Sequence, residues 1–248
     1  MKLRIALSAA SALFAAGLNT AHAEAPQTGS GTGTAIAEPL AQPPQAPVFS
    51  FNLTGASNYV FRGVSQTEND PAIFGSAKVN YDQFYAAVGG ENVNFHNGID
   101  AEYDMSAGWT PSVGEFNFDV GAIRYGYVNA PAHTDIDTTE IRGAVSRKFG
   151  DVKIGAALNY AIDYFGSKKD GTYVEGNASY AITDQLTASG AVGHQAISAG
   201  NDFAMWNMGA SYAFTKNIAL DLRYLDTDGH RFGNLYRSHY VAALKLNL

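Results

Sequence analysis

The sequence contains no cysteine and few charged residues. The absence of cysteine excludes disulfide scaffolds, cysteine-ligated zinc, iron–sulfur clusters and thiol nucleophiles. Lysine and arginine total 16 against 23 aspartates and glutamates, a formal charge of −7, so the chain lacks the basic surface that nucleic acid requires. Only 16% of the 248 residues are charged, whereas 46% are hydrophobic and 12% aromatic. This composition is not typical of a cytosolic enzyme and indicates surroundings that absorb apolar surface.

Motifs of catalysis are also lacking. The sequence has neither a G-x-S-x-G nucleophile elbow nor an H-E-x-x-H metal motif. Of the five histidines after residue 23, only His239 lies well within a predicted strand, and its alternation phase points it away from a lipid substrate. We therefore expect no catalytic residues, no cofactor and no metal. An outer-membrane enzyme stays a less favoured alternative, which a serine within hydrogen-bond reach of His239 would revive.

The first 23 residues have the features of a signal peptide. A short basic region precedes a run of about fourteen mostly small or apolar residues, too short to span roughly 30 Å of hydrocarbon. Ala21-His22-Ala23 then fits the A-x-A pattern of signal-peptidase cleavage, and no cysteine follows that could be lipidated. We expect export and a mature chain from Glu24 to Leu248 with a formal charge of −9.

Residues 24–47 hold five of the eight prolines and almost no large apolar residue. Such a segment cannot bury enough apolar surface to offset the entropy lost on ordering. We predict a disordered tether here, and a single folded domain over residues 48–248.

From residue 48 onward, apolar and polar residues alternate. Phe49, Phe51 and Leu53, for example, alternate with polar or small residues, and no comparable helical period appears. Because successive side chains of a strand point to opposite faces, each segment is predicted to be a ribbon with one apolar and one polar face. Twelve strands are expected, at about 49–62, 72–81, 84–94, 99–109, 115–127, 139–149, 152–164, 172–182, 186–194, 203–214, 218–226 and 236–248.

The connections between these strands alternate between short turns and longer loops. An even number of strands, with short periplasmic turns and longer extracellular loops, is typical of an outer-membrane β-barrel. The fold class predicted is therefore all-β: a closed antiparallel transmembrane barrel of about 12 strands. The sheet is expected to close into a barrel because hydrocarbon offers no hydrogen-bond partners for the free backbone groups at a sheet edge.

A soluble β-sandwich or lipocalin-like barrel would also show alternation. Many of the predicted strands run ten to thirteen residues, however, whereas strands in soluble proteins average about five or six. Aromatic residues are also expected to form girdles at the two membrane interfaces. The predicted girdles are Trp109, Phe149, Tyr180, Tyr212 and Phe214 at the turn end, and Tyr59, Phe61, Tyr164, Tyr224 and Tyr240 at the loop end.

The first predicted hairpin resembles a known family. The sequence SNYVFRGVSQT at 57–67, followed by PAI at 71–73, is similar to the opening motif of the TorF porin family. FYAAV at 84–88 and ENVNF at 91–95 are similar to its next strand. The resemblance would cover nearly all of 48–248; it implies an outer-membrane channel and brings no catalytic or ligand residues.

Charges of both signs are predicted to line the lumen, eight of each. As candidate pore-lining residues we single out Arg62, Asp100, Glu102, Asp104, Arg142 and Arg223. Asp100, Glu102 and Asp104 (the acid row) would stand about 6–7 Å apart on one strand face. Unpaired, they would favour cations; paired with the three arginines, they would only brace the wall. Arg62 is expected either at the pore mouth or hydrogen-bonded to loop carbonyls.

Residues 115–127 do not keep one phase: Phe116 and Phe118 share a parity, but Tyr125 and Tyr127 have the other. A β-bulge near Gly121 is predicted to reconcile them and to turn Arg124 inward. Without it, Arg124 would face lipid.

The function expected is a porin-like channel in the bacterial outer membrane for passive diffusion of small hydrophilic solutes or ions. Its partners would be outer-membrane lipid and those solutes, with no nucleic acid; the oligomeric state is not indicated. The main alternative is a non-conducting structural or adhesive barrel.

Overall fold

The computed structural model describes residues 46–95, 98–131, 136–198 and 200–248. The predicted signal peptide and all but the end of the predicted tether lie outside these residues. The long strands are β1 (Val48–Ala56), β4 (Ala72–Tyr81), β5 (Phe84–Asn92), β6 (Ala101–Trp109), β8 (Phe116–Val128), β9 (Thr138–Phe149), β10 (Val152–Ala161), β11 (Gly171–Ala181), β12 (Leu186–Ile197), β13 (Phe203–Ala213), β14 (Ile218–Thr227) and β15 (His239–Asn247).

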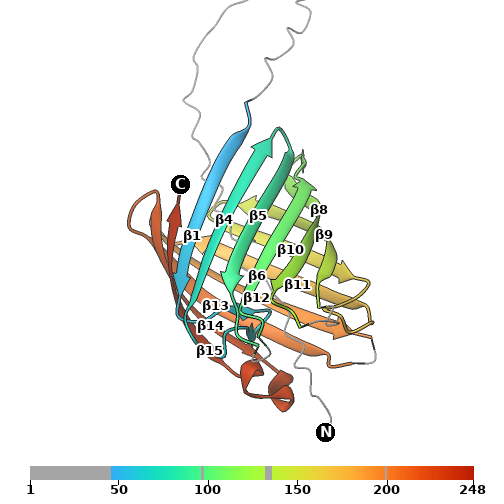
Figure 1. Cartoon of the computed structure of the whole chain (residues 1–248). Coiled ribbons are helices and arrows are strands. Elements are labelled where there is room, and N and C mark those ends of the chain that lie inside the picture. Colours follow the sequence, from blue (N-terminus) through green and yellow to red (C-terminus); the bar gives the residue numbers. More distant parts are fainter. Residues whose placement is uncertain (1–45, 96–97, 132–135, 199) are drawn as a thin grey trace, which may run out of the picture.

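These twelve strands form a closed antiparallel barrel (Figure 1). Each strand pairs with its neighbours along the chain, and β1 pairs with β15 to close the ring. Reciprocal bonds between Phe51 and Leu248 extend this seam, at 2.9 and 2.8 Å. The prediction of a twelve-stranded closed barrel is confirmed.

The two ends of the barrel differ. One carries the start of β1, the chain terminus at Leu248 and the tight turns (Figure 1). We call it the turn end; it also carries the short strand β7 (Ser112–Val113). The other, the loop end, carries the longer connections and two 3₁₀ helices, η2 (Gly229–Phe232) and η3 (Asn234–Tyr236). Within the described residues, no helix is long and apolar enough to cross a membrane.

The barrel wall is apolar outside and polar inside. In β1 the side chains of Phe49, Phe51 and Leu53 are exposed on the outer surface, whereas Thr54 is buried in the interior. Trp109 and the other aromatic residues predicted at the turn end are also exposed. The pattern is the reverse of that in a soluble protein, and it is typical of a barrel whose outer surface contacts lipid.

The predicted girdle at the loop end is partly wrong. Tyr240 is exposed and packs against Tyr224, with ring centroids 5.1 Å apart. Tyr59, Phe61 and Tyr164 are instead buried. The first strand ends at Ala56 rather than near residue 62. The chain turns into the lumen after Ala56, so Tyr59 and Phe61 lie inside the barrel.

The predicted bulge in the fifth strand is also wrong. Strand β8 pairs without a register shift with β6 on one side and β9 on the other, so Arg124 faces outward. It lies near the loop end and donates to Asp137 at 2.9 Å and Thr139 at 3.3 Å. Tyr125 and Tyr127 point into the lumen because the inward-folded chain offers them an apolar partner there.

Candidate functional site

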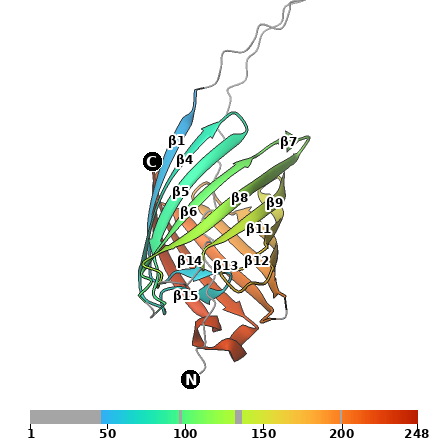
Figure 2. The ribbon, with the colours of Figure 1, turned by 45° about the vertical axis from the view of Figure 1, so that its right-hand side comes forward.

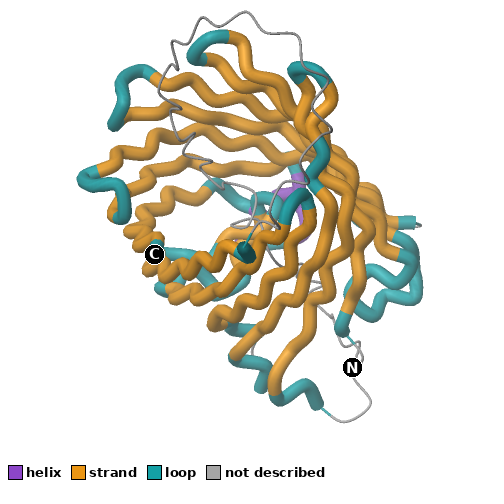
Figure 3. The backbone as a smooth tube through the Cα atoms, turned by 90° about the horizontal axis from the view of Figure 1, so that it is seen from above, coloured by secondary structure: helices purple, strands orange, loops and turns teal. Residues whose placement is uncertain are grey.

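The connection between β1 and β4, residues 57–71, folds into the lumen; we call it the inward loop. Its middle is a small hairpin of β2 (Val60–Phe61) and β3 (Val64–Ser65). Figure 2 shows these short blue-green strands within the ring of wall strands, and Figure 3 shows loop segments inside the same ring. Residues 58–67 are all buried. Arg62 and Gly63 form the tip, with backbone φ angles of 46° and 83°.

The local sequence explains why this loop holds one shape. Asn58 Oδ1 accepts hydrogen bonds from the hydroxyls of Ser65 at 2.8 Å and Thr67 at 3.1 Å, and its Nδ2 donates to Asn69 at 3.1 Å. The Thr67 hydroxyl also accepts from the backbone N–H of Tyr59 at 3.2 Å. Short polar side chains that bond to nearby backbone groups are favoured in turns. The motif at 57–67 therefore encodes the inward loop itself.

The tip of the inward loop reaches the far wall of the barrel. The loop starts between β1 and β4, and Arg62 contacts β9, β11 and β12, which lie across the ring in the strand order. At Gly63 an added Cβ would collide with Thr227 Cγ2 on β14 and would lie 3.1 Å from Met205 Cβ on β13. The hairpin therefore bridges the lumen from one side to the other.

Arg62 anchors the bridge. Its Nη1 donates to Glu140 Oε1 at 2.9 Å and to Gln195 Oε1 at 2.8 Å, and its Nη2 donates to Glu140 Oε2 at 2.6 Å. The guanidinium also lies over the rings of Phe61 and Tyr173, 4.5 and 4.2 Å from their centroids. Both charged side chains are almost fully buried, at 4% and 2% exposed. Burial by itself lowers the pKa of Arg62, but the Glu140 carboxylate, together with Tyr164 and Tyr125, acts in the opposite direction and the pKa is raised overall.

Aromatic packing fills the space beside the hairpin on the β5–β10 side. Phe61 packs edge-on against Tyr125, with centroids 6.3 Å apart, and Tyr125 packs against Phe165 at 5.6 Å. Tyr59 meets Phe74 of β4 at 5.0 Å. The lumen of a small barrel is filled by side chains of its own wall. A twelve-stranded barrel is wider, and here the inward loop fills part of the remaining space.

Toward the turn end the lumen is lined by partly exposed charges. Arg142 Nε donates to Asp119 at 3.3 Å, and both side chains are more than a quarter exposed. Arg223 bonds to Asp221 at 3.2 Å, and Lys245 lies 3.9 Å from the same carboxylate. These pairs join residues of the same or neighbouring strands, so they line the wall without crossing the lumen.

The acid row is divided by the structure. Asp100 precedes β6 and is exposed at the rim, where Asn129 donates to it at 3.4 Å. Glu102 and Asp104 are buried, each 2% exposed, and lie beside Glu91 of β5. In the described part of the chain, Arg62, Arg142 and Arg223 form their ion pairs with acids outside the row.

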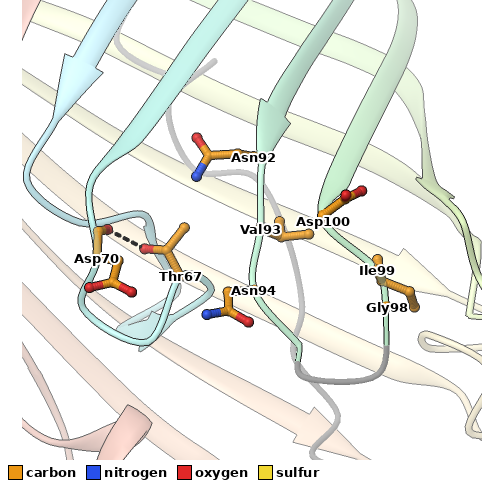
Figure 4. Close-up of a pocket in the computed structure, with 8 residues that line it drawn as sticks. All are labelled: Thr67, Asp70, Asn92, Val93, Asn94, Gly98, Ile99 and Asp100. Carbon is orange, nitrogen blue, oxygen red and sulfur yellow. Dashed lines mark hydrogen bonds between the residues drawn. The ribbon is translucent and has the colours of Figure 1, made fainter.

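At the rim a pocket of about 420 Å³ lies between the inward loop and the β5–β6 end (Figure 4). Its lining includes the carboxylates of Asp70 and Asp100 and the amides of Asn92 and Asn94. The dashed bond in the figure, from Thr67 to the Asp70 carbonyl at 2.6 Å, closes the end of the inward loop.

Sequence reasoning placed Arg62 among the pore-lining residues but did not identify its partners Glu140, Gln195 and Tyr173. The alternation that continues through Phe61 hid the departure of the chain from the wall. The signal that marks it is the uninterrupted polar run at 65–70 after Gly63, which a lipid-facing strand would not contain.

His239 gives no support to the enzyme alternative. It faces the lumen at the start of β15, and its ring nitrogens lie 3.4 Å from Asn58 Nδ2 and 3.0 Å from the Leu235 carbonyl. Neither described partner is a serine.

Similar folds occur among solved porins. A structure described as "KdgM porin" superposes with a TM-score of 0.58 at 8% identity, covering 79% of this chain and 98% of that one. A second, "KdgM porin in complex with disordered oligogalacturonate", gives 0.56 at 9% identity, with coverage of 80% and 98%. A NanC porin gives 0.54 at 13% identity, with coverage of 79% and 97%. At these identities the likeness shows a shared fold.

Among curated proteins none matches the sequence. Residues 41–245, most of the chain, match a family described as "Bacterial protein of unknown function (Gcw_chp)". The resemblance to the TorF family is not confirmed by this match and stays a prediction. The protein belongs to the Gcw_chp family, and its fold is that of outer-membrane porins.

Proposed function

We propose that the protein is a porin-like channel of the bacterial outer membrane, through which small hydrophilic solutes or ions diffuse passively. The observation that carries the proposal is the closed barrel with an apolar outer surface and a charged, partly exposed lumen toward the turn end. The likeness in fold to the KdgM and NanC porins supports it, as do the predicted signal peptide and the TorF-like motif. It acts without catalytic residues.

The inward loop is the constriction of this channel. A solute that enters from the turn end passes the charges of Arg142, Asp119 and Arg223 and then meets the hairpin held by Arg62 and Glu140. Charged rings select ions by sign. In this proposal Arg142 and Arg223 line the pore, Arg62 fixes the constriction, and the acid row biases the loop end toward cations.

A barrel that does not conduct is the second candidate. It is favoured by one observation: the hairpin bridges the lumen and its tip is buried on the far wall. Such a barrel would have a structural or adhesive role.

Planar-bilayer recording on the purified, refolded chain separates the two candidates. Discrete current steps support a channel, and a correctly folded barrel that stays silent under all voltages contradicts it and favours the closed barrel.

The same recording in a salt gradient tests the acid row. A variant with Asp100, Glu102 and Asp104 replaced by their amides is expected to lose cation preference, since it removes three negative charges from the loop end of the barrel. An unchanged reversal potential would remove the row from selectivity. The control is Glu115→Gln, since Glu115 is an exposed carboxylate at the turn end that pairs with Arg147 on the outer face of the wall; its reversal potential is expected to equal that of wild type.

A further inference from the structure

Three carboxylates meet inside the loop end of the barrel. Glu91, Glu102 and Asp104 are all buried, and each offers one oxygen such that the three oxygens lie within 4.8 Å of one another. Glu91 of β5 and Glu102 of β6 are direct cross-strand partners, a position in which like charges destabilise a sheet. We call these three residues the carboxylate cluster.

Ionised carboxylates this close repel one another, and a cation bound between them relieves that repulsion. The spacing suits a metal ion. Ca²⁺ binds oxygen ligands at about 2.3–2.6 Å, so a single ion can contact oxygens that are up to about 4.8 Å apart. An all-oxygen ligand set of this kind selects hard cations such as Ca²⁺ over softer metals.

The buried hydroxyl of Tyr127, beside the cluster, is a second and independent indication that a ligand binds here. Tyr127 lies opposite Glu102 in the β6–β8 register and faces the lumen. Its side chain is 7% exposed, and its hydroxyl has no hydrogen-bond partner among the described residues. The charges that act most strongly on that hydroxyl are those of Glu102 and Asp104. A buried polar atom without a partner requires an explanation, and an ion or water bound between it and the carboxylates supplies one.

We propose that Glu91, Glu102 and Asp104, with the Tyr127 hydroxyl, form a binding site for one divalent cation, with Ca²⁺ the preferred ion. The Tyr59 hydroxyl of the inward loop donates to Glu91 at 3.4 Å, so the bound ion stabilises the contact between this loop and the β5–β6–β8 wall. The site does not depend on conduction, and a silent barrel would bind the ion equally well.

The test is calorimetric titration of the refolded full chain with CaCl₂. Wild type is expected to bind about one Ca²⁺ per chain with a Kd on the order of 10⁻⁴ M or tighter. Glu102→Gln is expected to weaken binding at least tenfold, and Asp104→Asn provides a second variant should the first not fold. Asp100→Asn is the matched control, because this carboxylate precedes the same strand but is exposed and outside the cluster; its Kd is expected within about twofold of wild type.

Circular dichroism confirms that each variant is folded before titration. Wild type that binds no Ca²⁺ would overturn the proposal. Equal Ca²⁺ binding by wild type and both folded cluster variants, or an equal loss in Asp100→Asn, would also overturn it, because the ion would then bind elsewhere.

Discussion

Replacing Arg62 with alanine is expected to release the inward loop from the far wall of the barrel. The substitution removes three hydrogen bonds to Glu140 and Gln195 and the stacking of the guanidinium on two rings. It also leaves Glu140 buried, with the weaker bonds from Asn159 at 2.9 Å and Tyr125 at 3.4 Å. Breaking a buried ion pair from one side costs about 3–5 kcal/mol.

Because about 1.4 kcal/mol corresponds to a tenfold change in an equilibrium constant, a cost of about 3–5 kcal/mol raises the ratio of released to docked loops by between about 10²-fold and several thousandfold. In planar bilayers, Arg62→Ala is expected to show larger or more frequent current steps than wild type. Arg124→Ala is the control, since Arg124 faces outward, pairs with Asp137 and does not contact the inward loop; its conductance is expected to equal that of wild type.

The double variant Arg62→Met with Glu140→Met sharpens the test. Replacing both members of a buried pair by apolar residues of similar size is often neutral or stabilising, so this variant is expected to return toward wild-type conductance. The reasoning is refuted if Arg62→Ala conducts as wild type does, or if the double variant is as open as the single one.

Three further substitutions test the loop and the wall. Gly63→Ala is expected to weaken docking by about 1–3 kcal/mol and to raise conductance, because its φ is positive and the new Cβ would meet Thr227; wild-type currents would contradict this. Asn58→Ala removes the acceptor shared by two hydroxyls and is expected to cost about 1–3 kcal/mol, measured as faster protease cleavage within 57–71; an unchanged cleavage rate would count against it. Leu53→Arg, on the outer face, is expected to destabilise the barrel in lipid by up to about 2–4 kcal/mol, whereas Asn52→Arg, on the inner face, is expected to cost less; equal urea midpoints would refute the assignment of faces.

The alternation of side chains predicted most of the wall. Strand β4 spans Ala72–Tyr81, as expected, and most other long strands end within two or three residues of their predicted bounds. The two faces of a wall strand meet different surroundings, lipid outside and the polar lumen inside. Because side chains alternate between these faces, the pattern within a single strand is enough to identify it. The twelve-stranded closed barrel could therefore be predicted without knowledge of any contact.

The alternation rule gave the wrong direction for residues that the inward loop covers inside the lumen. Phe61 and Tyr164 have the period of a lipid-facing residue, and Tyr125 has the parity that a bulge was invoked to correct. All three are buried in the lumen, because the inward loop gives them an apolar partner there. Alternation along a strand shows that its two faces differ in polarity, but it does not show whether lipid, water or another part of the protein covers each face.

By itself the sequence determined the class of fold, the number of strands, the direction in which most wall residues face and the charged character of the lumen. Only the tertiary structure decided that residues 57–71 bridge the lumen, that Arg62 pairs with Glu140 rather than with the acid row, and that Glu91 joins Glu102 and Asp104. Arg62 and Glu140 are 78 residues apart in the chain. Closure of the ring brings such pairs together, and no periodicity along a single strand records which partner will stand across the lumen.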